Sequence, residues 1–314
     1  MNIKKLAAVG GLTLGMAISA VSAQAAVTQS WSFEDDDIDF VLDPRTLTPK
    51  TSGPIAVGDV FVSVFEIPEF TIDAVNGIPS GQELTGVAVV QLQAIVGTGV
   101  GAQYVYSAYS GGLNAILALG GGGPVVGGAA GEGALVSMWF NGTGTGADID
   151  LELNRTVNAA TNCASLSNCI EQASLGTLVQ VDGFKGDADE YWRAVQVAPG
   201  GGDLAQVLAL NNALPVSIGA FSLSTFYNMT GTVGWQDLGG NECAPGTDVS
   251  AVADGCAQFV GSFTLTGGDG LSNGAVAHSD FDANKLVSVP EPGVLSLLGA
   301  GLLGMGLRGR KRKS

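Results

Sequence analysis

The sequence predicts a mainly β body, antiparallel and sandwich-like, with a few short helices. A signal peptide is expected before it and a single transmembrane helix after it. Three observations predict this fold class. Runs of β-branched and aromatic residues recur between Gly, Pro, Asn and Asp. Hydrophobic residues make up 46% of the 314 residues, which is enough for a sizeable core. Charged residues make up only 13%, and 48 residues are Gly.

The first 25 residues predict a secretory signal peptide. Lys4 and Lys5 precede an apolar run, and Ala23-Gln24-Ala25 is a small-x-small cleavage pattern. We therefore expect the chain to enter the Sec export machinery, and the exported body to span 26–288.

Within the body, alternation and turn residues predict the secondary structure. Strands are expected over 61–67, 87–96, 103–109, 134–140, 148–153, 217–229, 231–236 and 258–265. Helices are expected over 112–119, 164–179 and 187–214, the last with a break at 200–202. The segment 158–214 therefore predicts a mixed insertion at one edge. One large β domain is favoured for the body, with two domains as the alternative.

The body contains four cysteines, an even number that favours disulfides in an exported protein. Three pairings are open. The local pairs Cys163–Cys169 and Cys243–Cys256 close the shortest loops, and both lie in turn-rich stretches, so we predict these two. Zinc ligands stand closer together in sequence than either pair does.

The charge of the body excludes one class of partner. Residues 26–289 hold 28 acidic and six basic side chains, a net charge of −22. Such a surface repels phosphate backbones, so no nucleic-acid binding is expected. The chain has a single His, which leaves little room for His-based metal or triad chemistry.

Two acidic clusters resemble calcium-binding loops in part. Glu34-Asp35-Asp36-Asp37-Ile38-Asp39 lacks the Gly and the terminal Glu of a calcium loop. Asp280, Asp282, Asn284 and Glu291 occupy positions 1, 3, 5 and 12 of such a loop, but Lys285 stands where its Gly belongs. We predict no specific metal site and no cofactor, only weak, nonspecific binding of Ca²⁺.

No catalytic set emerges from the motifs. Gly270-Leu271-Ser272-Asn273-Gly274 has the spacing of a nucleophile elbow, but Gly-rich flanks favour a turn. Gly97-Thr98-Gly99-Val100-Gly101-Ala102 has the loose spacing of a dinucleotide loop, but a strand follows it, so a hairpin is expected. No catalytic residue is assigned, and an enzyme is not expected.

The C-terminal end has three parts in order. Val289-Pro290-Glu291-Pro292 comes first, and an uncharged, mostly apolar run follows over 293–307. A helix of that length spans about 22 Å, short of the ~30 Å hydrocarbon core, and snorkelling basic side chains make up part of the gap. A basic cluster closes the sequence and predicts a cytoplasmic stop-transfer segment: Arg308, Arg310, Lys311, Arg312 and Lys313.

This three-part end over 289–314 resembles the PEP-CTERM sorting signal, and Val289-Pro290-Glu291-Pro292 carries the likeness. The resemblance implies processing by an exosortase in a Gram-negative bacterium that makes exopolysaccharide. It implies transient anchoring in the inner membrane and delivery to the cell surface or extracellular matrix.

The segment 57–140 is similar to flocculation-associated PEP-CTERM proteins. The likeness rests on Val57-Gly58-Asp59-Val60, on 82–87 and on 133–140. It implies a structural or adhesive protein that contributes to biofilm or floc formation within exopolysaccharide. A carbohydrate- or calcium-binding surface module is the alternative, and a secreted glycoside hydrolase is a weaker one.

Overall fold

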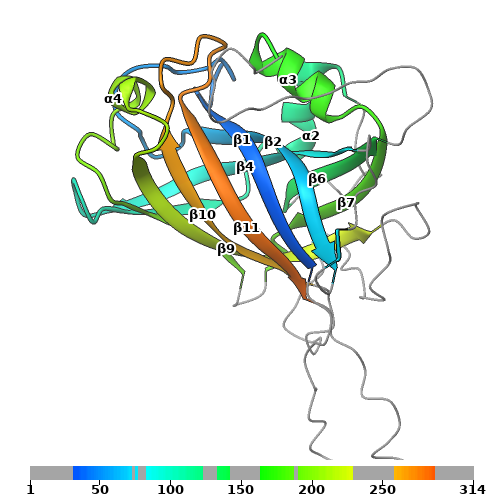
Figure 1. Cartoon of the computed structure of the whole chain (residues 1–314). Helices are drawn as coiled ribbons and strands as arrows, with labels where there is room; N and C mark the ends of the chain where they lie inside the picture. The colour runs from blue at the N-terminus through cyan, green and yellow to red at the C-terminus, as the bar shows by residue number, and fades with distance from the viewer. Residues whose placement is uncertain are drawn as a thin grey trace, which may run out of the picture. The chain divides into compact units, whose positions relative to one another are not determined.

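The computed structural model describes residues 31–72, 75–76, 83–122, 133–141, 163–186, 190–228 and 258–286 (Figure 1). The segment Gln29–Val287 forms one compact unit by its internal contacts. The helices are α2 (Leu113–Leu117), the 3-10 turn η1 (Ala118–Gly120), α3 (Leu166–Ala173) and α4 (Leu204–Ala209). The strands are β1 (Trp31–Leu42), β2 (Val60–Ile72), β3 (Val75–Asn76), β4 (Glu83–Val96), β5 (Gln103–Ser107), β6 (Ala134–Asn141), β7 (Thr177–Gly183), β8 (Tyr191–Gln196), β9 (Pro215–Asn228), β10 (Gln258–Gly267) and β11 (Ala277–Leu286).

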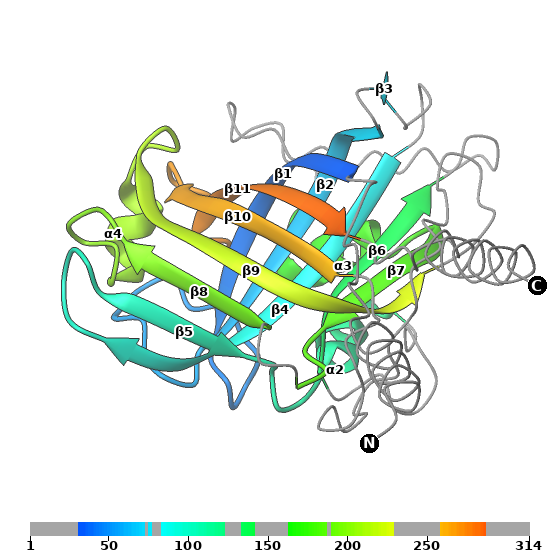
Figure 2. The ribbon, with the colours of Figure 1, turned by 90° about the horizontal axis from the view of Figure 1, so that it is seen from below.

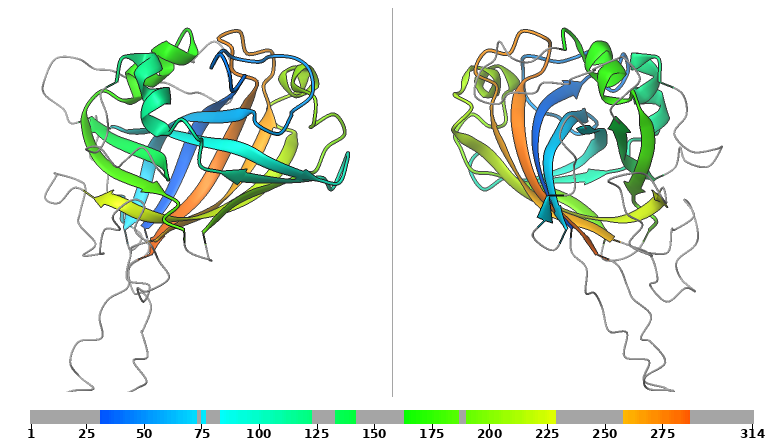
Figure 3. Two further views of the ribbon diagram at one scale, coloured as in Figure 1. Left: turned by 180° about the vertical axis from the view of Figure 1, so that it is seen from behind. Right: turned by 45° about the vertical axis from the view of Figure 1, so that its right-hand side comes forward.

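These strands form one antiparallel sheet that closes on itself. Its order is β3-β2-β1-β11-β10-β9-β7-β6-β4-β5-β8, and additional pairings join β2 to β4 and β9 to β8. Figure 3 shows the curved strands surrounding a common interior. The predicted mainly β, antiparallel body is confirmed, and its two sides are parts of one continuous sheet.

Two long strands complete the closure because each pairs with two short strands along one edge. The first half of β4 pairs with β6 and its second half with β5. In the same way, β9 pairs with β8 over 217–222 and with β7 over 224–228. The pairs β5·β8 and β6·β7 therefore close the sheet side by side, as Figure 2 shows. The segment predicted as an edge insertion supplies β7 and β8 to this closure.

Residues 37–42 of the first strand are buried on both faces. Ile38, Phe40 and Leu42 are fully buried in a cluster that contains residues of β2, β4, α2 and α3. Because side chains alternate along a strand, Asp37 and Asp39 lie on the opposite face. Both are buried as well, at 2% and 9% exposure. The acidic run weighed above as a calcium loop is thus part of a central strand.

The short helices cover the sheet and one end of its interior. In α3, the buried Leu166, Cys169, Ile170 and Ala173 follow helical spacing, and Thr85 of β4 donates a 2.8 Å hydrogen bond to the Ala173 carbonyl. In α4, Leu204 and Val207 pack with Val41 and Val216 at one end of the sheet. The α4 helix begins at Asp203, whose carboxylate accepts from the Ala205 and Gln206 amides.

Most of the predicted elements that fall within the described residues are confirmed. The helix predicted over 112–119 forms as α2 and η1. The helix predicted over 164–179 ends earlier, because Gly176 adopts φ +107° and β7 begins at Thr177. The helix predicted over 187–214 is wrong at 191–196, where exposed and buried side chains alternate and β8 pairs with β5 and β9. The strands predicted over 148–153 and 231–236 lie outside the described residues.

The three stretches that carry the second resemblance come together in space. Residues 57–60 lead into β2, residues 83–87 open β4, and 134–140 belong to β6. The strand β4 pairs with β2 on one side and with β6 on the other. These stretches therefore form neighbouring strands of one wall.

Candidate functional site

The predicted sorting residues Val289, Pro290, Glu291 and Pro292 lie outside the described residues, as do the signal peptide and the predicted membrane helix. The same holds for the basic residues 308–313 and for the pair Cys243–Cys256. Among the helices that the structure describes, none has the length and apolar character needed to cross a bilayer.

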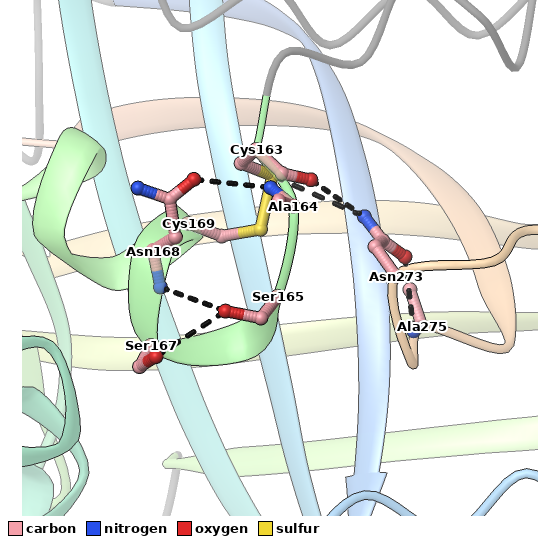
Figure 4. Close-up of a disulfide and its surroundings, with 8 residues drawn as sticks. All are labelled: Cys163, Ala164, Ser165, Ser167, Asn168, Cys169, Asn273 and Ala275. Atoms are coloured by element: carbon pink, nitrogen blue, oxygen red, sulfur yellow. Dashed lines mark hydrogen bonds between the residues drawn. A yellow bond between two sulfur atoms is a disulfide. The ribbon is translucent and has the colours of Figure 1, made fainter.

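Cys163 and Cys169 form a disulfide, one of the two predicted pairs (Figure 4). It joins the approach to α3 with the middle of that helix. Ser165 caps the helix by accepting from the Asn168 amide at 3.4 Å. Asn273, in the β10–β11 loop, donates to the Cys163 carbonyl at 3.2 Å. The bond therefore fixes α3 at its N-terminal end, next to a loop from the far end of the chain.

The two rejected sequence motifs are turns, as predicted. Gly97, Gly99 and Gly101 have positive φ in the hairpin between β4 and β5. The segment 270–274 lies in the loop between β10 and β11, with no helix after it. His278 is buried on β11, and its Nδ1 lies 3.2 Å from the Asp37 carbonyl oxygen. Asp280, Asp282 and Asn284 alternate along the same strand, so they do not form a calcium loop.

A cavity of about 70 Å³ lies inside the closed sheet. Residues from β1, β2, β4, β5, β6, β8, β9, β10 and β11 line it, which places it between the walls. Its aromatic lining residues are Phe61, Phe65, Tyr106, Trp192, Phe221, Phe259, Phe263 and Phe281. Trp192 stacks on Phe221 with 4.9 Å between ring centroids, and Phe65 meets Phe281 edge to face at 5.2 Å.

The polar part of this cavity includes two acids and three serine hydroxyls. Asp37 and Asp39 of β1 line it together with Ser63, Ser217 and Ser279. Asp37 Oδ2 accepts hydrogen bonds from the hydroxyls of Ser63, at 2.8 Å, and Ser279. Its Oδ1 accepts from the Ser279 amide. Asp37 is thus fully engaged with its neighbours.

Asp39 differs from the other buried acids in its partners. Its Oδ2 is buried and has no hydrogen-bond partner among the described residues. By contrast, Asp182 accepts from Gln180 at 2.6 Å and from Thr225 at 2.7 Å. Asp59 accepts from Lys50 at 2.6 Å and from the Ala56 amide. Buried acceptors are almost always satisfied in folded proteins, so Asp39 is unusual among the buried acids that the structure describes.

Burial dominates the electrostatics of the two acids. It raises the pKa of Asp37 from 3.8 to about 6, although hydrogen bonds from Ser279 and Ser63 lower it in part. Burial and then the charge of Asp37 raise the pKa of Asp39 well above its usual value. Two neighbouring buried carboxylates disfavour each other's ionised form. The cavity therefore favours a proton or another positive group beside Asp39.

A second concave feature lies on the outer face of β8, β9, β10 and β11. It is an open groove of about 490 Å³. The strand register sets Arg193, Ala220, Ser262 and Asp282 in one row across the four strands. A second row contains Val195, Ile218, Thr264 and Asp280. Tyr191 is 38% exposed, and the Arg193 guanidinium lies 5.8 Å from the centre of its ring.

The sequence analysis did not predict the interior cavity or the outer groove. The stretch Phe40-Val41-Leu42 is apolar at every position, which is typical of a strand buried on both faces. That signal marks the preceding Asp37 and Asp39 as buried. The groove has no comparable signal, because its rows join residues far apart in the sequence. Within the described residues no group of three or more His, Cys, Asp or Glu side chains is arranged to hold a metal ion.

In comparisons with known proteins, one family model matches part of the chain. The family described as the PEP-CTERM protein-sorting motif matches residues 288–312. The match confirms the sorting signal predicted at this end of the chain, which marks the protein as exported and sorted by an exosortase of Gram-negative bacteria. No curated protein and no solved structure shows significant similarity to the chain.

Proposed function

We propose that this exported, exosortase-sorted protein is a structural or adhesive component of the cell surface or extracellular matrix, where it contributes to biofilm or floc formation with exopolysaccharide. The sorting motif at residues 288–312 is the observation that carries the proposal. A protein retained in a polysaccharide matrix needs a surface that contacts sugars, and the outer groove over β8–β11 is the best candidate.

The groove combines the groups that bind sugars. The exposed Tyr191 ring offers an apolar face, and Ser262 and Thr264 supply hydroxyls along the floor. Arg193 donates hydrogen bonds at one side, and Asp280 and Asp282 accept them at the other. An amphipathic aromatic ring beside convergent polar groups fits a polyhydroxylated chain, and Arg193 also suits an acidic sugar. No catalytic activity forms part of this proposal.

The proposal is tested with variants in the producing organism. Deletion of the gene should weaken settling of flocs and reduce matrix content. Replacement of the chromosomal copy by the double variant Tyr191→Ala, Arg193→Ala should shift the protein from matrix to medium and lower its co-sedimentation with isolated exopolysaccharide about tenfold. Arg45→Ala, which removes an exposed Arg from a distant loop, is the matched control.

Two results would count against the proposal. Unchanged settling and matrix content after deletion would contradict the structural role. Co-sedimentation that is equal for the groove variant and Arg45→Ala would remove the groove as the contact surface. The main alternative is a sugar- or calcium-binding module, and one saturable site in titrations with Ca²⁺ or defined oligosaccharides would favour it. Turnover of polysaccharide by the purified chain would instead establish a hydrolase.

A further inference from the structure

The interior cavity is lined by a buried carboxylate oxygen that has no hydrogen-bond partner among the described residues. Asp37 receives donors from Ser63 and from both the amide and the hydroxyl of Ser279. The neighbouring Asp39 is 9% exposed and lines the same cavity, but its Oδ2 has no partner among the described residues. A carboxylate oxygen in this position can only accept a hydrogen bond. A ligand that completes it must therefore bring a donor.

The acids and aromatic rings that line the cavity favour a donor with a positive charge. Two acids lie two residues apart on β1 with no basic side chain among the lining residues of the cavity. The facing walls are aromatic, among them Phe61, Tyr106 and Trp192. Aromatic faces attract cations within about 6 Å, and the attraction is strongest where water is excluded. An acid–aromatic enclosure of this kind suits an ammonium group better than a neutral hydroxyl.

The geometry points to a small protonated amine as the ligand of this cavity, with its ammonium group donating to Asp39 Oδ2 and its alkyl part packed between the aromatic rings. This inference goes beyond the proposed role in the matrix, because it concerns the interior of the sheet and not its outer face.

The size and position of the cavity limit the ligand. About 70 Å³ is several times the ~10–15 Å³ that one water molecule needs, so a ligand of a few heavy atoms fits. Trp192 and Tyr106 line the cavity and are only partly buried. They belong to the β5·β8 pair, next to the junction with β6·β7. Entry is therefore expected beside these two rings.

The ionisation of the acids gives the site a pH dependence. Burial raises the pKa of Asp37 to about 6 and raises that of Asp39 well above its usual value. The groups around them are the hydroxyls of Ser63 and Ser279, the phenol of Tyr106, and Asp280, whose charge adds to the rise at Asp37. Alkylammonium binding should thus strengthen as the pH rises and the two acids ionise.

Titration of the purified full chain tests the inference. Butylammonium chloride and 1-butanol, which share one alkyl chain, are titrated by calorimetry at pH 5 and pH 8 in amine-free buffer. At pH 8 we expect one saturable butylammonium site with a Kd in the millimolar range or tighter, at least tenfold tighter than for 1-butanol. At pH 5 the preference should disappear. Asp39→Asn should weaken butylammonium binding at least tenfold, whereas Asp282→Asn, on the outer face, should leave it unchanged.

Three results would overturn the inference. They are the absence of a saturable site in the folded chain, equal affinity for the amine and the alcohol at pH 8, and binding of the amine that survives Asp39→Asn. If Asp39→Asn does not fold, titration of the unchanged chain with butylammonium and 1-butanol at pH 5 and pH 8 still tests the inference. None of these results depends on matrix retention, so this inference and the proposed function stand or fall separately.

Discussion

At the scale of single residues, the partners of a buried acid decide what it contributes. Asp59 is neutralised by Lys50, and Asp182 has donors on both oxygens. Asp37 has three donors, although its charge lies beside that of Asp39. Asp39 keeps one oxygen without a partner among the described residues. An unsatisfied buried acceptor costs about 1–3 kcal/mol, and more when it is charged. The cost at Asp39 should therefore appear in the stability of the protein.

The stability should fall as these acids ionise. Burial raises the pKa of Asp37 in the folded chain from its ordinary value of 3.8 to about 6, so the unfolded state binds fewer protons between these values. The contribution of Asp37 to the free energy of unfolding therefore decreases as pH rises from about 4 to 6, and the raised pKa of Asp39 adds a decrease of the same sign. We expect Asp39→Asn to raise the free energy of unfolding by about 1–3 kcal/mol at pH 7.5 and to change it little at pH 4.5. Urea denaturation in amine-free buffer measures the free energy of unfolding at both pH values.

Asp43 supplies a control, because its pKa is lowered in the folded chain whereas that of Asp39 is raised. The Arg45 amide, at 2.8 Å, is the main cause that lowers the pKa of this exposed carboxyl. The ionised Asp43 carboxylate stabilises the folded chain at neutral pH, and this stabilisation is lost as pH falls. Asp43→Ala should therefore lower the free energy of unfolding slightly at pH 7.5 and less at pH 4.5. Destabilisation by Asp39→Asn at both pH values would show that its carboxylate is well satisfied, contrary to the prediction.

At the scale of elements, long strands and short helices have different roles. The strands β4 and β9 each pair with two short strands, so the sheet closes without one long strand filling the remaining gap. Close packing at β4 depends on Gly86, where an added Cβ would lie 2.7 Å from the Ser137 carbonyl oxygen and would clash with Phe65. The short helix α3 relies on its apolar face and its disulfide, since isolated helices of this length are marginal in water.

The disulfide should stabilise the α3 region more than the rest of the sheet. Chain-entropy arguments give about 2 kcal/mol for a loop as short as that between Cys163 and Cys169. We expect the double variant Cys163→Ser, Cys169→Ser to lose about this much, with faster amide hydrogen exchange in 163–174. Exchange in β10 and β11 should change little. Ser167→Ala, an exposed substitution in the same helix, is the control. Uniformly faster exchange throughout the sheet would instead assign the disulfide a global role.

At the scale of the whole molecule, an acidic and closed body is combined with a sorting motif at residues 288–312. The net charge of −22 over residues 26–289 keeps copies of the body apart at low ionic strength, and divalent cations screen it. Nonspecific association with Ca²⁺ needs only this charge density.

Glu291→Ala separates sorting from folding. Glu291 is the only acid of the sorting motif, and we expect its loss to leave uncut protein in the inner membrane. Fractionation followed by mass spectrometry of the C-terminal peptide measures this. The unchanged chain should end near Pro290–Pro292 in matrix or medium. Glu171→Ala, in α3, is a control that keeps the motif intact. Normal processing of Glu291→Ala would contradict the role assigned to this residue.

The sequence by itself determined the β class, the hairpin at 97–102, the local cysteine pair and the sorting motif. Each of these depends on residues close together in the chain: alternation within one strand, glycines in one turn, or a short motif. The tertiary structure alone decided the closure of the sheet, the hydrogen-bond partners of Asp37 and Asp39, and the rows of the outer groove. These depend on strand register between distant segments, such as Asp39 opposite Ser63 and Ala277. Alternation within one strand fixes which face each residue occupies, but which distant strand lies opposite follows from how all the strands pack together.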